Sequence, residues 1–528
     1  MAFTAALLFI CGPIWHRRWY FSATQRFRRE LGDPEGWLDR HDYDTEAGPE
    51  ALRRDGEHRE PRTAGQGLPV TRFGFSPGTL VSGAREVRGR AVYAPWPRAV
   101  GIFGPQDSGK TQLLIPMVLD SPAATFAATT KPELVVATRR LREQVGPTAL
   151  FNPLERGGLE HSCGFDPVAG CADSGTAGRR AASLVRGAGG AAGIDRANFW
   201  AGKAAEVLRY YLCAAALGDL DMTAVAHWVN NPDGDPTPLA VLEQRPAAPA
   251  GWHQELRSIL GTIKDTRDGY FSTATSAVAF MDIPAVRDAC RPGPGQAFDV
   301  ASFLAARGTL YAIGDSKDTR LAPLYTALTE HLFDTAQAIA APLTGNRLPE
   351  PLNMLLDEVA HMTPVPLHEW LGDSRGWGIT VVPVVQSRAQ FDSTWGRDNG
   401  KTIWDNLPTK IVLPKVADTD MLRDLSYLAG ERLVRQRTEG SNHHGAGLFS
   451  GGGGTSISEQ IVREPVISGP SIAGMPRWHA FVLGLSRHPA VLRYEPGYQR
   501  VARDTAALDR AQAAGPRDSQ TRDARTRR

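Results

Sequence analysis

The residues best suited to chemistry form a glycine-rich stretch that ends in a lysine and a threonine. The stretch consists of Gly104, Pro105, Gln106, Asp107, Ser108, Gly109, Lys110 and Thr111. This spacing matches the phosphate-binding loop, in which backbone N–H groups cradle phosphate oxygens. In such a loop Lys110 reaches the β- and γ-phosphates, and the Thr111 hydroxyl binds Mg²⁺. The alternative is a chance glycine-rich turn, but a strand pattern before it and a helix pattern after it favour a nucleotide site.

Two adjacent acids supply the expected second half of that site. Asp357 and Glu358 end the apolar segment 352–358, which is typical of a buried strand. At the end of that strand Asp357 would hold Mg²⁺ with Thr111, directly or through water. Glu358 would orient and deprotonate the attacking water. Both acids could instead simply face solvent, but the upstream phosphate loop favours the catalytic roles.

Two more polar residues flank the apolar run 379–385. Gln386 follows the run and could sense the γ-phosphate or the attacking water, or it could only bond to loop backbone. Arg375 precedes the run within a glycine-rich turn at 372–378. It could be a finger that neutralises charge at a neighbouring subunit's nucleotide, or it could be a surface salt-bridge partner.

The elements around these motifs alternate between strands and helices, which predicts a parallel α/β sheet. The strand candidates are 99–103, 124–129, 148–151, 308–314, 352–358, 379–386 and 410–414. Between 173 and 286 the pattern changes, because Ala- and Leu-rich helical stretches dominate there. We interpret this part as a helical insertion in the α/β domain.

The N-terminal sequence differs from this core. Residues 1–15 are uncharged and mostly apolar, and three basic residues follow at 16–18. A membrane span needs about 20 residues, so three interpretations remain: a short or N-terminally incomplete anchor, an interfacial segment, or a buried helix. The basic flank with nearby aromatic residues favours an anchor. Residues 26–71 are rich in charge, Gly and Pro, which predicts a small helical or partly disordered linker, with a juxtamembrane stalk as its functional interpretation.

Length and composition set broad limits. A chain of 528 residues is expected to form two or more domains. Its formal net charge of +2 decides nothing about a nucleic-acid partner, so any basic surface must be local. The cysteines, Cys11, Cys163, Cys171, Cys213 and Cys290, are odd in number and lack zinc or redox spacing. Free thiols in a reducing cytoplasm are the simplest interpretation.

The ordered set of motifs resembles the TraG/TraD-type coupling proteins of type IV secretion. That family has Asp-Glu, an arginine in a glycine-rich turn, an apolar strand, Gln-Ser-x-x-Gln and an aromatic residue before Gly. The corresponding segments here are 355–360, 373–379, 385–391 and 395–396. Weaker likenesses occur at 130–133, 198–200 and 428–430. The resemblance covers about residues 87–498, and the set in this order is specific although no single piece is.

The resemblance implies an α/β fold: a RecA-like P-loop NTPase domain with an inserted all-α domain and a short N-terminal membrane-proximal segment. With the element pattern it predicts the following division of the chain: a membrane anchor (1–25), a linker or stalk (26–77), a nucleotide-binding domain in two parts (78–172 and 301–500), the all-α insertion (173–300) and a disordered tail (501–528). It also favours Arg375 as a finger acting on a neighbour and Gln386 as a sensor.

The same resemblance implies a function. It predicts an ATP- and Mg²⁺-dependent nucleoside triphosphate hydrolase that translocates DNA in conjugation as a homo-hexamer. The chain would be held at the bacterial inner membrane, with its bulk in the cytoplasm. The expected partners are DNA, single-stranded and bound without sequence preference, a relaxase, and the components of the type IV secretion channel.

The sequence also departs from the family. At most one short membrane segment is present, and the family's D-P-K-G-E element has lost its Asp and Gly around Lys131 and Glu133. Asp107 places a negative charge where small or basic residues are common. Two alternatives therefore remain: an FtsK/HerA-like duplex DNA pump, and a cargo-docking receptor with weak hydrolysis. The first should carry a C-terminal DNA-reading module, which the charged tail after Arg503 does not resemble.

Overall fold

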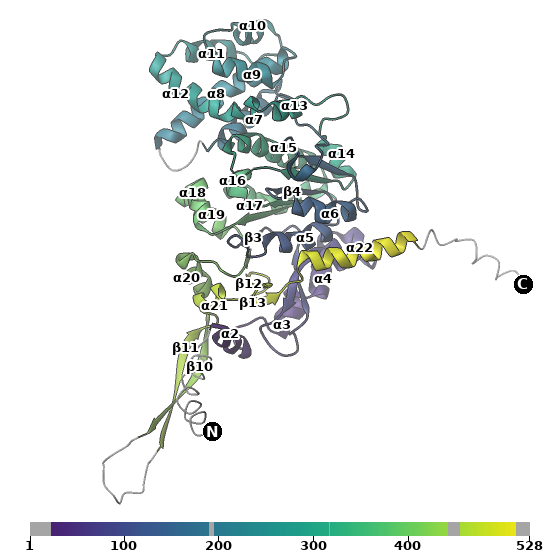
Figure 1. Cartoon of the computed structure of the whole chain (residues 1–528), viewed down its shortest axis with the longest axis vertical. Coiled ribbons are helices and arrows are strands. Elements are labelled where there is room, and N and C mark those ends of the chain that lie inside the picture. Colours follow the sequence, from purple (N-terminus) through teal and green to yellow (C-terminus); the bar gives the residue numbers. More distant parts are fainter. Residues whose placement is uncertain (1–22, 190–194, 316, 442–454, 514–528) are drawn as a thin grey trace, which may run out of the picture.

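The computed structural model describes residues 23–189, 195–315, 317–441 and 455–513. Its body is built on one 11-stranded sheet with the order β2-β1-β13-β12-β9-β3-β8-β7-β4-β6-β5 (Figure 1). The strands are β1 (Gly74–Leu80), β2 (Ala91–Pro95), β3 (Val100–Phe103), β4 (Thr125–Thr129), β5 (Thr148–Phe151), β6 (Thr309–Ile313), β7 (Leu352–Leu356), β8 (Ile379–Val385), β9 (Thr409–Val412), β12 (His479–Leu483) and β13 (Ala490–Arg493). From β9 to β5 all pairs are parallel. The other strands extend the sheet with antiparallel pairs.

The parallel strands form the buried centre, and the α/β class expected from the sequence is confirmed. Strands β7 and β8 are buried along their whole lengths, as a sheet covered on both faces requires. Successive side chains alternate between two cores. Met354 packs in one core with Leu328 of α15, and Leu355 packs in the other with Leu114 of α5. Helices on both faces therefore fix the strand ends at which the site lies.

The helices of the body surround this sheet. They are α5 (Lys110–Asp120), α6 (Glu133–Arg142), α15 (Ala322–Ala340), α16 (Val359–Met362), α17 (Leu367–Trp377), α18 (Ala389–Trp395), α19 (Arg397–Asp405), α20 (Thr419–Leu428) and α21 (Gly469–Ala473). Helix α5 begins directly at the end of the glycine-rich stretch. It contains Pro116, which stands in the second turn and not at the end of the helix.

A separate helical layer lies at one end of the sheet (Figure 1). Its helices are α7 (Ser174–Gly187), α8 (Asp195–Leu217), α9 (Met222–Asn230), α10 (Thr237–Gln244), α11 (Trp252–Leu260), α12 (Lys264–Val278), α13 (Pro284–Ala289) and α14 (Val300–Ala305). Its core is aromatic: Tyr211 of α8 packs between Trp228 and Phe271. Within the described part of 174–305 no strand is assigned.

A buried glutamate joins this helical layer to the body. Glu330 of α15 accepts a hydrogen bond from Ser183 and forms an ion pair with Arg186, both on α7. Burial raises the pKa of Glu330 above its usual value, and the Arg186 charge opposes that shift. The first helix of the insertion is therefore bonded to the body through charged groups as well as apolar ones.

The N-terminal segment is helical, which was one of the alternatives for 26–71, but it packs on the body and does not form the linker or stalk expected over 26–77. It folds into α2 (Ala23–Gly32), α3 (Arg40–Asp42), a π-helical turn (Tyr43–Ala47) and α4 (Pro49–Arg59). Trp37 and Leu38 are only 1% and 0% exposed, and Leu38 donates a backbone hydrogen bond to Pro489. A few large apolar residues among many charges are enough to pack this segment on the body. The average composition of the segment conceals them.

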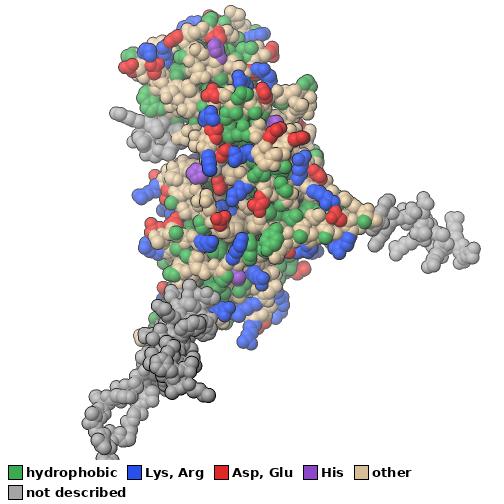
Figure 2. Space-filling model, in the orientation of Figure 1, with side chains coloured by type: hydrophobic (Ala, Val, Ile, Leu, Met, Phe, Trp, Pro, Cys, Tyr) green, Lys and Arg blue, Asp and Glu red, His purple; other side chains and the backbone are tan. Residues whose placement is uncertain are grey.

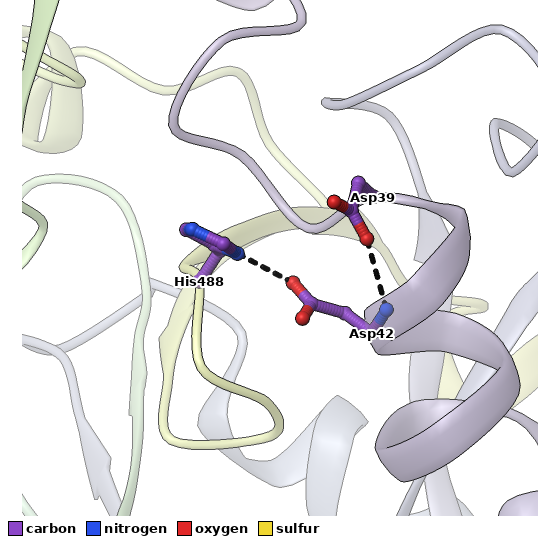
Figure 3. Close-up of side chains that lie close together, drawn as sticks. All are labelled: Asp39, Asp42 and His488. Atoms are coloured by element: carbon purple, nitrogen blue, oxygen red, sulfur yellow. Dashed lines mark hydrogen bonds and ion pairs between the residues drawn. The ribbon is translucent and has the colours of Figure 1, made fainter.

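A histidine contact helps to hold that segment (Figure 3). His488, in the turn between β12 and β13, lies with its Nδ1 2.7 Å from Oδ2 of Asp42. Asp39 caps α3 by accepting a hydrogen bond from the Asp42 backbone N–H at 2.9 Å. Asp42 is buried, so this contact between distant parts of the chain is largely shielded from water.

The C-terminal tail is also more ordered than expected from 501 onwards. Helix α22 (Gly497–Ala513) continues to Ala513 and packs on α5 and α6. Arg500 forms an ion pair with the buried Asp120 at 2.8 Å, and Asp509 pairs with Arg140. The charges that suggested disorder are thus partners for charges on the body. Residues 514–528 lie outside the described part.

A two-stranded antiparallel ribbon, β10 (Glu431–Ser441) and β11 (Thr455–Pro465), projects from the body beside α2 (Figure 1). Arg432 at its base is buried and donates a hydrogen bond to the Glu30 carbonyl at 3.0 Å. Over the face seen in Figure 2, basic and acidic side chains are interspersed.

None of the described helices is both long and apolar enough to cross a membrane. Most of the anchor expected at 1–25 lies outside the described residues.

Candidate nucleotide-binding site

The glycine-rich stretch connects β3 to α5, at the carboxyl edge of the parallel strands. Gly109 has a φ of +102°, and a Cβ there would lie 2.4 Å from the hydroxyl oxygen of Tyr494. A Cβ on Gly104 would lie 2.5 Å from the Ser108 hydroxyl oxygen. Other groups approach both glycines so closely that a larger side chain would clash at either position. Without side chains there, the loop backbone can wrap a phosphate.

Asp107 stands where small or basic residues are common in the family, and the backbone conformation at this position suits an aspartate. Its φ is +58°, in the left-handed region that short polar side chains tolerate better than most. The side chain is exposed at the rim of the loop. It raises the pKa of Lys110 less than the other carboxylates do.

Lys110 is buried inside the loop. Its ammonium group donates hydrogen bonds to the carbonyls of Gly104, at 2.7 Å, and Pro105, at 3.1 Å. Burial lowers the pKa of Lys110, while the nearby Asp357 and Glu358 carboxylates oppose the shift. The cation is therefore held where the phosphate oxygens of a nucleotide would lie.

The two acids follow β7. Strand β8 lies between β7 and β3, the strand that the glycine-rich loop follows. Asp357 is 3% exposed, and one carboxylate oxygen accepts a hydrogen bond from the Thr129 hydroxyl at 3.3 Å. Its other oxygen is buried and has no hydrogen-bond partner in the described part of the chain. Burial, and then the Glu358 charge, raise the pKa of Asp357 to about 6. Glu358 is held at a φ of +51°, a strained conformation for a long side chain.

These groups surround one cavity of about 370 Å³. The predicted residues that line it are Pro105, Gln106, Asp107, Gly109, Lys110, Thr111, Asp357 and Glu358. Gly104 and Ser108 lie behind this lining and support the loop. Lys131 and Glu133, the altered remnant of the D-P-K-G-E element, also line the cavity.

Gln386 lies beside the loop but does not line the cavity. The preceding residue, Val385, accepts a hydrogen bond from the Gly104 backbone N–H at 3.1 Å. The backbone N–H of Gln386 donates to the Gln390 side chain, whose amide nitrogen is 3.0 Å from Nε2 of His361. The second glutamine of the motif thus links the end of β8 to α16, the helix that follows Glu358.

Arg375 is far from its own chain's loop. It lies in helix α17, not in a glycine-rich turn, because buried Trp370 and Leu371 anchor the helix and Gly378 ends it at a φ of +79°. Strand β8 runs from Ile379 next to this helix to Val385 next to the loop, so Arg375 is at the opposite edge of the sheet. Its exposed guanidinium forms no ion pair or hydrogen bond with other described residues.

Four residues that line the cavity were not expected from the sequence: Gln112, Lys415, Arg477 and Trp478. Lys415 follows β9, and the end of a parallel strand is a detectable signal for a ligand site. Arg477 and Trp478 precede the antiparallel strand β12, and nothing in their local sequence indicates that they reach the loop.

The residues present fit a magnesium–nucleotide complex. Mg²⁺ prefers oxygen ligands, and the unpartnered buried oxygen of Asp357 lies in the same cavity as the Thr111 side chain. Lys110 and the loop backbone supply positive charge and N–H donors for phosphates. Bound Mg²⁺ would supply positive charge beside Asp357, whose pKa is raised by burial and then by the Glu358 charge.

Comparison with known proteins finds a matching family model and several solved structures of similar fold. Residues 351–477 match the family described as the TraM recognition site of TraD and TraG. The trigonal form of the bacterial conjugative coupling protein TrwB, in complex with sulphate, is 20% identical with a TM-score of 0.58, covering 76% of this chain and 88% of that one. TrwB with the ATP analogue ADPNP is 19% identical with a TM-score of 0.56, covering 80% and 89%. No curated protein matches the sequence.

A further TrwB structure, in complex with ADP and Mg²⁺, is 18% identical with a TM-score of 0.53 and covers 77% of this chain and 87% of that one. These matches cover 76%, 80% and 77% of this chain. The expected fold, a RecA-like domain with an inserted all-α domain, is thereby confirmed.

Proposed function

We propose, on the premise that this chain is a TraG/TraD-type coupling protein, that it is an ATP-driven motor for DNA. In this proposal the chain moves DNA, together with its relaxase, toward a type IV secretion channel. The observation that carries the proposal is the convergence of Lys110, Asp357 and Glu358 on one cavity.

Each of these residues has a separate task. Lys110 binds the β- and γ-phosphates, and its charge stabilises the negative charge that develops during phosphoryl transfer. Asp357 and Thr111 hold Mg²⁺, which supplies further charge neutralisation when bound. Glu358 accepts a proton from the attacking water, and its strained backbone fixes the carboxylate at the rim of the cavity. Gln386 is included in the proposal as the sensor of the γ-phosphate or of the attacking water, a role that its amide could take only if it moved to the cavity that it does not line here.

The proposal includes a homo-hexamer, which the family resemblance implies, and Arg375 lies too far from the nucleotide site of its own chain to act there. A neighbouring subunit that places its α17 against this cavity would supply the arginine finger. The inner-membrane anchor at 1–25, sequence-independent DNA contacts and the domain boundaries given above are parts of the same proposal. TrwB has been crystallised with both ATP and GTP analogues, so we infer that this chain accepts either purine nucleotide.

Phosphate release by the purified full-length chain tests the motor. We expect hydrolysis that single-stranded DNA stimulates and that Lys110→Ala abolishes. Lys401→Ala, which removes an exposed lysine of α19, serves as the matched control and should retain wild-type turnover. Stimulation by duplex DNA alone would favour the FtsK/HerA-like pump instead. Relaxase binding with no DNA-stimulated turnover would contradict the motor and favour the docking receptor.

A further inference from the structure

The side of the cavity away from the catalytic acids carries an aromatic residue in an unusual conformation. Trp478 has a φ of +65°, which is a genuine outlier for a bulky side chain. Lys415, at a φ of +70°, lines the same cavity. Strained backbone persists where the surrounding structure holds it, and it clusters at ligand sites. Two such residues in one cavity therefore point to a binding role.

The order of the strands places Trp478 at the base end of a bound nucleotide. The loop follows β3, the acids follow β7, and β8 lies between those strands. Trp478 precedes β12, which lies beyond β9 on the other side of β3. Since Asp357 and Glu358 would act at the γ-phosphate end, the ribose and base must extend in the opposite direction.

Trp478 is also held tightly against the phosphate loop. A Cβ on Gly109 would lie 3.2 Å from the Trp478 ring. Tyr494 packs edge-on to the ring, with centroids 5.8 Å apart, and donates a hydrogen bond to the Ser108 carbonyl at 3.4 Å. The ring position is thus fixed relative to the phosphate cradle.

One face of the ring already holds a flat cationic group. The Arg477 guanidinium lies 4.3 Å from the centroid of the Trp478 ring. Guanidinium groups stack on indole faces through the ring quadrupole, and a nucleobase stacks on the same kind of surface. The half-buried ring therefore presents a face suited to a planar ligand.

We propose that Trp478 is the platform on which the base of the bound nucleotide stacks, in place of the Arg477 guanidinium. This inference rests on the proposed nucleotide-binding function and names the part of the cavity that holds the base. Stacking depends on the π surface and not on hydrogen bonds to the base edge. ATP and GTP should therefore bind with similar affinity, and pyrimidine triphosphates should bind more weakly.

Titration calorimetry of the full-length chain with Mg²⁺ and three ligands tests the platform: ATP, GTP and inorganic tripolyphosphate, which lacks a base. Trp478→Ala should weaken ATP and GTP binding about 5- to 100-fold and leave tripolyphosphate binding unchanged. Trp478→Phe should restore most of the loss. The matched control is Tyr494→Phe, which removes only the hydroxyl and should affect ATP and tripolyphosphate equally.

Two results would overturn the stacking role. One is an unchanged ATP affinity in Trp478→Ala. The other is an equal loss of tripolyphosphate affinity, which would mean that the ring only supports the loop. Failure of the motor proposal is a different result, because it would show as DNA-independent turnover or as full activity of Lys110→Ala in hydrolysis.

Discussion

Asp357 is a cavity residue whose protonation depends strongly on its surroundings. Its pKa of about 6 arises from burial and from the Glu358 charge, and Lys110 offsets only part of the shift. The folded chain keeps this proton up to about pH 6, whereas an unfolded aspartate releases it near pH 4. The unfolded state therefore binds fewer protons between these values, and stability falls as the pH rises through this range.

Replacement of Asp357 by Asn should remove that dependence. At pH 8 we expect the variant to be more stable than the wild type by up to about 3 kcal/mol, because the Asn carries no buried charge. At pH 4 the two proteins should unfold at nearly the same urea concentration. Urea denaturation without nucleotide at both pH values measures this. A variant less stable than the wild type at pH 8 would contradict the burial argument.

Single residues also show how far the sequence predicts the site. Lys110, Thr111, Asp357 and Glu358 are found by spacing, because their roles depend on loops that directly follow buried strands. Trp478 is not found this way, because its place beside the loop depends on antiparallel pairing of β12 with β9, a long-range contact. Arg375 was not predicted to be helical because two glycines lie near it, and glycine has a low helix propensity. Packing of the neighbouring apolar residues outweighs that low propensity.

Among the elements, the N-terminal helices were the least predictable. Their charges suggested a linker, yet the Asp42–His488 contact and buried Trp37 attach them to the sheet. The composition of a segment predicts disorder when the segment has too few apolar residues to form its own core. This prediction fails here because the few apolar residues of the segment are buried against the core of the body. The seven parallel strands, by contrast, were all predicted, since each carries its own apolar run.

The Asp42–His488 contact can be tested by itself. His488→Ala leaves the buried Asp42 carboxylate without that partner and should lower the free energy of unfolding by about 1–3 kcal/mol. Arg40→Ala removes an exposed ion pair with Asp44 nearby and should cost at most about 0.5 kcal/mol. Chemical denaturation of both variants measures the difference.

The same three side chains, Asp39, Asp42 and His488, also lie close enough together to hold a cation. If the contact is a direct hydrogen bond, EDTA should leave the unfolding midpoint of the wild type unchanged. A clear drop on addition of EDTA would show that a metal ion links these groups instead.

At the scale of the whole molecule, the proposed assembly predicts sites shared between chains. Arg375→Ala should bind nucleotide as the wild type does but hydrolyse it about 10³-fold or more slowly. Lys110→Ala should also be inactive, because its own cavity is impaired. Mixing the two inactive variants should restore part of the turnover, since some cavities with Lys110 would meet an intact Arg375.

Phosphate release from the mixed and unmixed variants measures this complementation. Arg375→Lys provides a control, because it keeps the charge but loses the planar fork of donors. Mixtures that stay inactive while the variants co-assemble, as seen by size-exclusion chromatography, would contradict a finger acting between chains.

Lys110 and Arg375 lie at opposite ends of the parallel strands of one sheet. This placement limits how many complete sites a given number of chains can form. If Arg375 acts on the nucleotide of a neighbour, as proposed, an isolated chain would hold two unmatched halves and no complete site. An open row of chains would leave one loop and one arginine unused at its ends, and only closure into a ring matches every half. Turnover per chain should therefore rise with protein concentration even when nucleotide is saturating, and it should level off once rings are closed.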